Sequence, residues 1–361
     1  MIEQPTRRQA LLLLGALAGW PAWADVSAQL VATWVSEGRH RAGLLRMQGD
    51  AVSIRETIDL PTRAHGLDVE SDGSVLVAAR RPGDWLLRWH PARARAQWCW
   101  VDDDRRLNGH VLRAPPSAAD GAGTVWTTET DQADASGWIG VRDADTLAKR
   151  AEWRTHGMDP HAMLVLPERV GEVPAGALLV ANGGIPTQSE TGRSHRNLAR
   201  MDPSLVALDA RDGRLIGQWR LPDPRLSIRH LAFDPVSRQV GIALQAEHDD
   251  EALRRDAPLL AIWGAGGLQA APDMPRGMGY GGDICARPGG GFLVSASRAH
   301  AVLATDAAGR IMRRLALQDA VALACAGARW WAAGSQTLAI DAAPVSLTAS
   351  LRLDNHWVAL G

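Results

Sequence analysis

Short hydrophobic runs with polar residues at alternating positions recur along almost the whole chain after residue 25. Examples are SVLVAAR, TVWTTET, ALLVANG, QVGIALQ and GFLVSAS, each bounded by glycine, proline, aspartate or asparagine. A period of two is the pattern of a β-strand, and regularly spaced turn residues between such runs are typical of all-β folds. The pattern therefore predicts antiparallel sheets joined by turns.

Each run follows another strand-like segment across a turn, so the chain consists of repeating units. The units begin at the polar anchors His65, His110, His161, His230, Asp283 and Asp319. Their spacing centres on the size of one four-stranded propeller blade, about 40–45 residues. Such a spacing predicts a β-propeller, in which every blade presents its first strand to a central channel.

The two ends of the chain complement each other. Residues 28–60 have the pattern of the second, third and fourth strands of a blade, and the final DNHWVALG has the pattern of a first strand, anchored by His356. Joined, they form a last blade and leave no free sheet edge. We therefore predict an all-β, seven-bladed β-propeller as a single domain over residues 25–361, closed by N-terminal strands plus a C-terminal inner strand.

Residues 1–24 have the pattern of a signal peptide. Arg7 and Arg8 precede an apolar stretch from Ala10 to Ala18, and Ala22-Trp23-Ala24 precedes Asp25 like a cleavage site. The paired arginines favour the twin-arginine export route over the general one, although alanine stands where that signal usually has phenylalanine. The sequence therefore predicts a periplasmic protein with no stable membrane insertion.

Charge and cysteine content narrow the function further. The net charge of −1 provides no electrostatic footprint for nucleic acid. The three cysteines, Cys99, Cys285 and Cys325, form no metal-binding pair in the sequence. Export permits one disulfide, for which Cys285 and Cys325 are the candidates, but three buried thiols are the preferred interpretation.

The anchors indicate where a functional site lies. First strands begin, and second strands end, at the same rim of a propeller, so the side chains at those positions should meet at one channel mouth. Five of the eleven histidines are anchors, and imidazole is a ligand for iron, copper and zinc. We therefore predict a metal site with the candidate ligands His65, His110, His161, His230, His356 and Glu129, and iron or copper as candidate metals. Candidate ligand-binding groups are Arg81, Asn182, Arg193, Arg229, Gln245 and Asp283. The alternative is that these side chains only satisfy backbone groups and ordered water in the channel.

Several stretches resemble the exported bacterial β-propeller family DUF1513: AARRPGDW, GMDPHAML, LLVANGGIPTQSETGR, LSIRHLAF and LDNHW. The resemblance implies a seven-bladed propeller with YVTN-like geometry. It also implies a link with imelysin-type periplasmic proteins, and hence with iron.

Three functions are consistent with these patterns. The first is a monomeric periplasmic protein that binds a transition metal or metal chelate, as an accessory in iron or other metal uptake. The second is a metal-dependent enzyme of the lactonase or oxidoreductase kind. The third is a docking scaffold whose histidines are structural, and fold alone does not choose among them.

Overall fold

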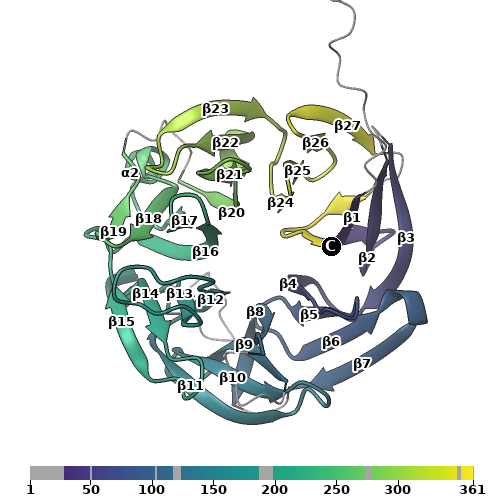
Figure 1. Cartoon of the computed structure of the whole chain (residues 1–361), viewed down its shortest axis with the longest axis horizontal. Coiled ribbons are helices and arrows are strands. Elements are labelled where there is room, and N and C mark those ends of the chain that lie inside the picture. The colour runs from purple at the N-terminus through teal and green to yellow at the C-terminus, as the bar shows by residue number, and fades with distance from the viewer. Residues whose placement is uncertain are drawn as a thin grey trace, which may run out of the picture.

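Blades of antiparallel strands surround a central channel (Figure 1). The computed structural model describes residues 28–48, 51–101, 104–116, 123–186, 198–272, 279–347 and 351–360. The predicted signal peptide lies outside the described residues. None of the helices in the described ranges is long and apolar enough to cross a membrane.

Five blades are separate four-stranded sheets whose strands pair in chain order. Blade 1 contains β4 (Ala64–Val69), β5 (Val75–Ala79), β6 (Trp85–His90) and β7 (Arg95–Trp100). Blade 2 contains β8 (Arg105–Arg113), β9 (Thr124–Asp131), β10 (Ser136–Asp143) and β11 (Lys149–Met158). Blade 3 contains β12 (Pro160–Val165), β13 (Leu178–Asn182), β14 (Ser204–Leu208) and β15 (Leu215–Trp219). Blade 4 contains β16 (Leu226–Asp234), β17 (Gln239–Ala246), β18 (Leu260–Gly264) and β19 (Gly267–Ala270). Blade 5 contains β20 (Gly281–Ala286), β21 (Phe292–Ala296), β22 (Ala301–Thr305) and β23 (Ile311–Ala316). Short helical turns η1 (Pro91–Arg93), η2 (Leu198–Arg200), α2 (Glu251–Asp256) and η3 (Ser297–Ala299) lie in connections.

The remaining two blades confirm the predicted closure. Blade 6 contains β24 (Ala322–Ala326), β25 (Arg329–Ala333), β26 (Leu338–Ile340) and β27 (Ala343–Leu347). Blade 7 contains the N-terminal β1 (Ala28–Ser36), β2 (Arg39–Gln48) and β3 (Ala51–Leu60), with the C-terminal β28 (Arg352–Leu353) and β29 (Val358–Leu360) paired to β1. A short parallel pairing of β27 with β3 joins blades 6 and 7 at the outer edge. The fold is thus a seven-bladed β-propeller whose last blade takes strands from both ends of the chain.

The hydrophobic core lies between adjacent blades. Every residue of the second strand β5, VLVAA, is buried, because both faces of an inner strand pack against a neighbouring blade. Between blades 3 and 4, Leu179 of β13 and Ile242 of β17 belong to one buried cluster. Each such side chain stabilises the fold by roughly 1.5–3 kcal/mol, so the blades hold each other in a closed ring.

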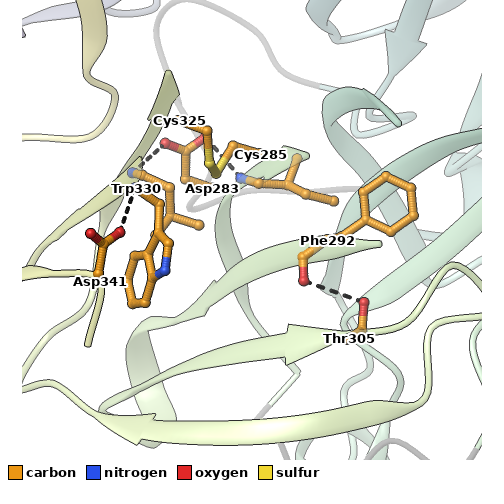
Figure 2. The surroundings of a disulfide bond; sticks show 9 residues. Asp283, Cys285, Phe292, Thr305, Cys325, Trp330 and Asp341 are labelled. Carbon is orange, nitrogen blue, oxygen red and sulfur yellow. Dashed lines mark hydrogen bonds between the residues drawn. A yellow bond between two sulfur atoms is a disulfide. The ribbon is translucent and has the colours of Figure 1, made fainter. Parts of the chain in front are cut away.

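A disulfide joins Cys285 in β20 to Cys325 in β24, across the junction of blades 5 and 6 (Figure 2). The preferred prediction of free thiols is therefore wrong for these two cysteines, whereas Cys99 is free and partly buried. Equivalent strands of neighbouring blades lie side by side, a proximity that cysteine spacing alone does not reveal. Asp283, on the same strand as Cys285, accepts the backbone N–H of Leu323 at 3.0 Å and so ties the same two blades together.

We expect the Cys285→Ser variant to be destabilised by roughly 3 kcal/mol relative to the oxidised protein, because the disulfide closes a loop over a sequence separation of 40 residues. Urea unfolding with and without reductant measures this difference. Reductant should lower the stability of the parent protein and leave that of Cys285→Ser unchanged. Equal stability of the oxidised parent and the variant would contradict the structural role of this bond.

Candidate functional site

Five histidines from different blades meet inside the channel, although they are far apart in the sequence. His65 lies in β4, His110 in β8, His161 in β12 and His230 in β16, and His356 precedes β29. The ring centroids are 4.8 Å apart for His65 and His110, and 4.5 Å apart for both His161–His230 and His230–His356. We call these five residues the histidine ring.

The inner strands carry the histidines at local irregularities. In four blades, the register of the pairing between the first and second strands shifts near the histidine. The shifts lie between Ala64 and Leu67, between Leu107 and Val111, between Pro160 and Met163, and between Ile228 and His230. A bulge bends the strand and changes the direction of a side chain. A common irregularity at these anchors thus accompanies their convergence on the channel axis.

Three nitrogens converge on Nε2 of His161. The Nε2 atoms of His65 and His230 each lie 3.3 Å from it, and Nη2 of Arg229 lies 3.5 Å from it. One imidazole nitrogen carries either one proton or one lone pair, so it satisfies one good hydrogen bond at a time. The three contacts therefore compete for the one proton or lone pair of His161 Nε2.

Other ring nitrogens have no hydrogen-bond partner among the described residues. They are buried and comprise His65 Nδ1, His110 Nε2, His161 Nδ1 and His356 Nε2. On the opposite side of its imidazole, His356 Nδ1 lies 3.2 Å from Oδ1 of Asp283. A carboxylate in this position orients a metal-binding histidine and makes it a stronger ligand.

Burial keeps three members of the ring in the neutral form. Desolvation lowers the pKa of His65, His110 and His161 well below 6.5, and repulsion from neighbouring histidines and Arg229 lowers it further. A neutral imidazole has the free lone pair that a metal ligand requires. These three histidines are therefore in the ligand form at neutral pH.

These shifts predict that acid destabilises the fold. Unfolding exposes the imidazoles and returns their pKa values to about 6.5, so the unfolded chain binds more protons below that pH. Stability should be constant above about pH 7.5 and fall progressively below about pH 6.5. Burial raises the pKa of Asp68 to about 6, so protonation of this one carboxyl stabilises the fold as the pH falls and partly offsets the trend. Urea unfolding between pH 8 and pH 5 tests the prediction, and an unchanged midpoint over this range would contradict it.

A buried ion-pair cluster supports the histidine ring. Asp159 is fully buried and accepts a hydrogen bond from Arg229 Nη1 at 2.9 Å, pairs with Arg81, and accepts from Asn108 Nδ2 at 3.1 Å. Its backbone is left-handed, with φ of 54°, a conformation that aspartate tolerates better than most residues. Because Arg229 also reaches His161, Asp159 fixes a charged group beside the ring.

A small cavity opens on the histidine ring, and we call it the mouth cavity. It has a volume of about 30 Å³, and its lining includes His65, His161, His230, Arg80, Arg81 and Arg229. The other polar side chains of its lining are those of Asn108, Gln245, Tyr280 and Asn355. This volume suits one or two water-sized occupants.

Residues 58–360 match the sequence profile of a family described as "Protein of unknown function (DUF1513)". The chain belongs to this DUF1513 family. The family predicted from the sequence is thereby confirmed, and the structure confirms the predicted fold. No curated protein matches this DUF1513 chain in sequence.

Solved structures share the architecture of this DUF1513 protein at low identity. Hydrazine synthase of Kuenenia stuttgartiensis is 12% identical with a TM-score of 0.60, over 89% of this chain and 98% of that chain. Virginiamycin B lyase of Staphylococcus aureus is 12% identical with a TM-score of 0.54, over 79% and 85%. A functionally unknown protein of Desulfotomaculum acetoxidans is 11% identical with a TM-score of 0.52, over 86% and 88%. Likeness at this level shows a common fold only.

The structure separates Glu129 from the histidine ring. Glu129 is fully buried in β9, where Oε1 accepts from Arg142 Nη2 at 2.6 Å and Oε2 pairs with Lys149 Nζ at 3.1 Å. Arg142 also donates to the backbone oxygen of Leu147 at 3.2 Å. The carboxylate is thus held by cations of its own blade, and it is in neither of the three-histidine groups that could hold a metal.

The other candidate ligand-binding residues of this DUF1513 protein divide into two groups. Arg81, Arg229 and Gln245 line the mouth cavity. Asn182 instead donates to the backbone oxygen of Thr155 at 2.9 Å, Asp283 supports His356, and Arg193 lies outside the described residues. The anchor Asp319 bonds to Ser335 at 3.0 Å and is about half exposed.

Sequence reasoning missed four polar residues at the site: Asp159, Asn108, Asn355 and Tyr280. Asn108 and Asp159 each stand two residues before a predicted histidine, and Asn355 stands directly before His356. Tyr280 is the single tyrosine of the chain. Proximity to an anchor was the available signal for three of them, whereas Tyr280 had none because it precedes an aspartate anchor by three residues.

Proposed function

We propose that this protein binds a transition-metal ion on the histidine ring in the periplasm and serves as an accessory in metal acquisition. The observation that supports the proposal most directly is the convergence of imidazole nitrogens. Two sets, His65–His110–His161 and His65–His230–His356, each offer three ligand atoms within 4.8 Å of one another. His65 is common to both sets.

The spacing of the nitrogens fits a metal ion. Metal–imidazole bonds of about 2.0–2.1 Å in tetrahedral geometry require ligand nitrogens about 3.3 Å apart. The Nε2 atoms of His65 and His161, which share one set, are 3.3 Å apart. Nε2 of His230, from the other set, also lies 3.3 Å from Nε2 of His161. A metal ion bound among these nitrogens accepts several lone pairs at once, whereas a hydrogen bond between two neutral imidazoles uses only one lone pair.

The donor set and the cavity volume narrow the identity of the ligand. Imidazoles without a carboxylate in the ring suit copper, zinc, iron or nickel rather than magnesium or calcium. A cavity of about 30 Å³ has room for an ion with one or two small ligand atoms but not for a haem. The proposal is therefore for an ion, with copper and iron as the first candidates. The paired arginines near the N-terminus resemble a twin-arginine export signal, which supports export of this protein in the folded state.

A direct titration tests the proposal. Protein stripped with a chelator is titrated with Cu²⁺, Fe²⁺ and Zn²⁺, and bound metal is counted after gel filtration by mass spectrometry. We expect about one equivalent of copper or iron, with protons released from any charged histidine. Less than about 0.2 equivalents of every metal at pH 7 would overturn the proposal.

The same material separates the two alternative functions. Hydrolysis of a lactone or oxidation of a phenol by the metal-loaded protein, lost when the metal is removed, would place it among metal-dependent enzymes. Capture of periplasmic partners by the metal-free protein, with no metal bound at all, would favour a docking scaffold.

A further inference from the structure

The side chains around the mouth cavity are cationic or neutral. Arg80, Arg81 and Arg229 line it, and no aspartate or glutamate of the described residues does. The remaining polar lining comes from amides, a phenol and three imidazoles, of which desolvation keeps His65 and His161 neutral by lowering their pKa. A cavity of this composition has a positive potential where it opens.

Carboxylates close to the cavity are already bonded to protein donors. Asp159 holds Arg229 and Arg81, Asp283 accepts the backbone N–H of Ile284 at 2.9 Å, and Glu247 accepts from Gln245 Nε2 at 2.6 Å. Asp159 and Glu247 bond to residues of the lining and so reduce its positive potential, but no carboxylate itself belongs to the described lining. Arg80 is exposed and makes no ion pair among those found in the described residues.

We infer that the mouth cavity binds the carboxylate group of a small organic acid, directly above the histidine ring. Guanidinium groups match a carboxylate in shape and charge and bind it with two parallel hydrogen bonds. The carboxylate oxygen would face the nitrogens of His161 and His230, where a ring-bound metal accepts an oxygen ligand. The pairing with a metal rests on the proposed function, whereas the anion site depends on the arginines alone.

The inference explains why cations surround a site that is proposed for a cation. Arg229 Nη2 lies 3.5 Å from His161 Nε2, and this positive charge disfavours a bare divalent ion at the ring. The negative charge of a carboxylate bound beside the metal offsets the repulsion between Arg229 and the ion. The physiological ligand would then be a metal ion together with an organic acid.

Isothermal titration of metal-free protein with oxalate tests the anion site independently of any metal. We expect saturable binding that weakens as sodium chloride rises from about 50 to 200 mM. Arg80→Gln should weaken the binding about fivefold and Arg80→Glu more strongly, because a charge-assisted hydrogen bond is lost and then replaced by repulsion. Arg80 is exposed, so neither change disturbs the core.

Arg313→Gln is the matched control. Arg313 is an exposed arginine of the outer strand β23, so the variant changes the net charge equally but leaves the mouth cavity intact. Its affinity for oxalate should equal that of the parent protein. No oxalate binding by the parent, or equal losses in the Arg80 and Arg313 variants, would overturn the inference. Failure of the metal titration alone would overturn the proposed function and leave the anion site standing.

Discussion

Replacing Asp159 with alanine is expected to lower the free energy of unfolding by roughly 4 kcal/mol, since it leaves two buried guanidinium groups without their counter-ion. Arg229 and Arg81 have side-chain exposures of 4% and 12%, too low for water to replace the lost partner. Asn108 loses an acceptor at 3.1 Å as well. Asp159→Asn should cost less, because asparagine keeps the shape, one acceptor and the tolerance of a left-handed backbone.

Asp202→Ala provides the comparison for this prediction. Asp202 also holds an arginine by two hydrogen bonds, to Arg220 at 2.7 and 3.0 Å, but both side chains are almost half exposed. Its loss should cost no more than about 1 kcal/mol. Urea unfolding of the three variants gives the result, and similar stabilities for Asp159→Ala and Asp202→Ala would show that the buried cluster does not stabilise the fold.

Replacing His65 with alanine is expected to reduce the affinity for copper or iron at least about 100-fold, because His65 belongs to both three-nitrogen sets. His110→Ala leaves the set with His230 and His356 intact, and His356→Ala leaves the set with His110 and His161 intact. Each of these two variants should therefore lose about tenfold or less. The pattern of one severe and two mild losses is specific to a shared ligand.

The control for this series is His300→Ala, which removes a half-exposed histidine bonded to Asp319. It should bind metal like the parent protein. Circular dichroism and urea unfolding establish that the His65→Ala variant is folded before its metal binding is compared. Equal affinity of folded His65→Ala and parent protein would show that the metal, if bound, lies elsewhere.

The arrangement of the histidine ring could be predicted because propeller symmetry brings equivalent positions of successive blades to the same level around the channel. Each histidine of the ring lies in a first strand or shortly before one, and first strands form the wall of the channel. His65, His110, His161 and His230 therefore converge whatever connects their blades. The same logic placed His356 in the ring, since the closing strand is also a first strand.

The misplaced residues show where this logic ends. Second strands end at the rim of the mouth, which predicted Glu129 and Asn182 there. The first strand of each blade, however, stands between these residues and the channel. Their side chains lie between strands and blades, where Arg142 and Ser204 respectively bond to them. Arg81 reaches the mouth because it lies beyond the end of β5, in the connection to β6.

The role of Asp159 could not be predicted, and Cys285 and Cys325 could be named only as a candidate pair, because both features depend on contacts between blades. Arg229, which pairs with Asp159, is 70 residues away in the sequence. Cys285 and Cys325 are 40 residues apart, a separation that brings two cysteines together only if they occupy equivalent strands. Such pairings require a register that alternating patterns do not fix to the single residue.

X-ray absorption spectroscopy of the protein loaded with one equivalent of Cu²⁺ tests the central claim most directly. A metal on the histidine ring predicts a first shell of at least about three nitrogen ligands near 2.0 Å with the outer-shell scattering of imidazole. Added oxalate should introduce an oxygen ligand in the parent protein but not in Arg80→Glu. A first shell of oxygen atoms alone, unchanged in His65→Ala, would contradict the account.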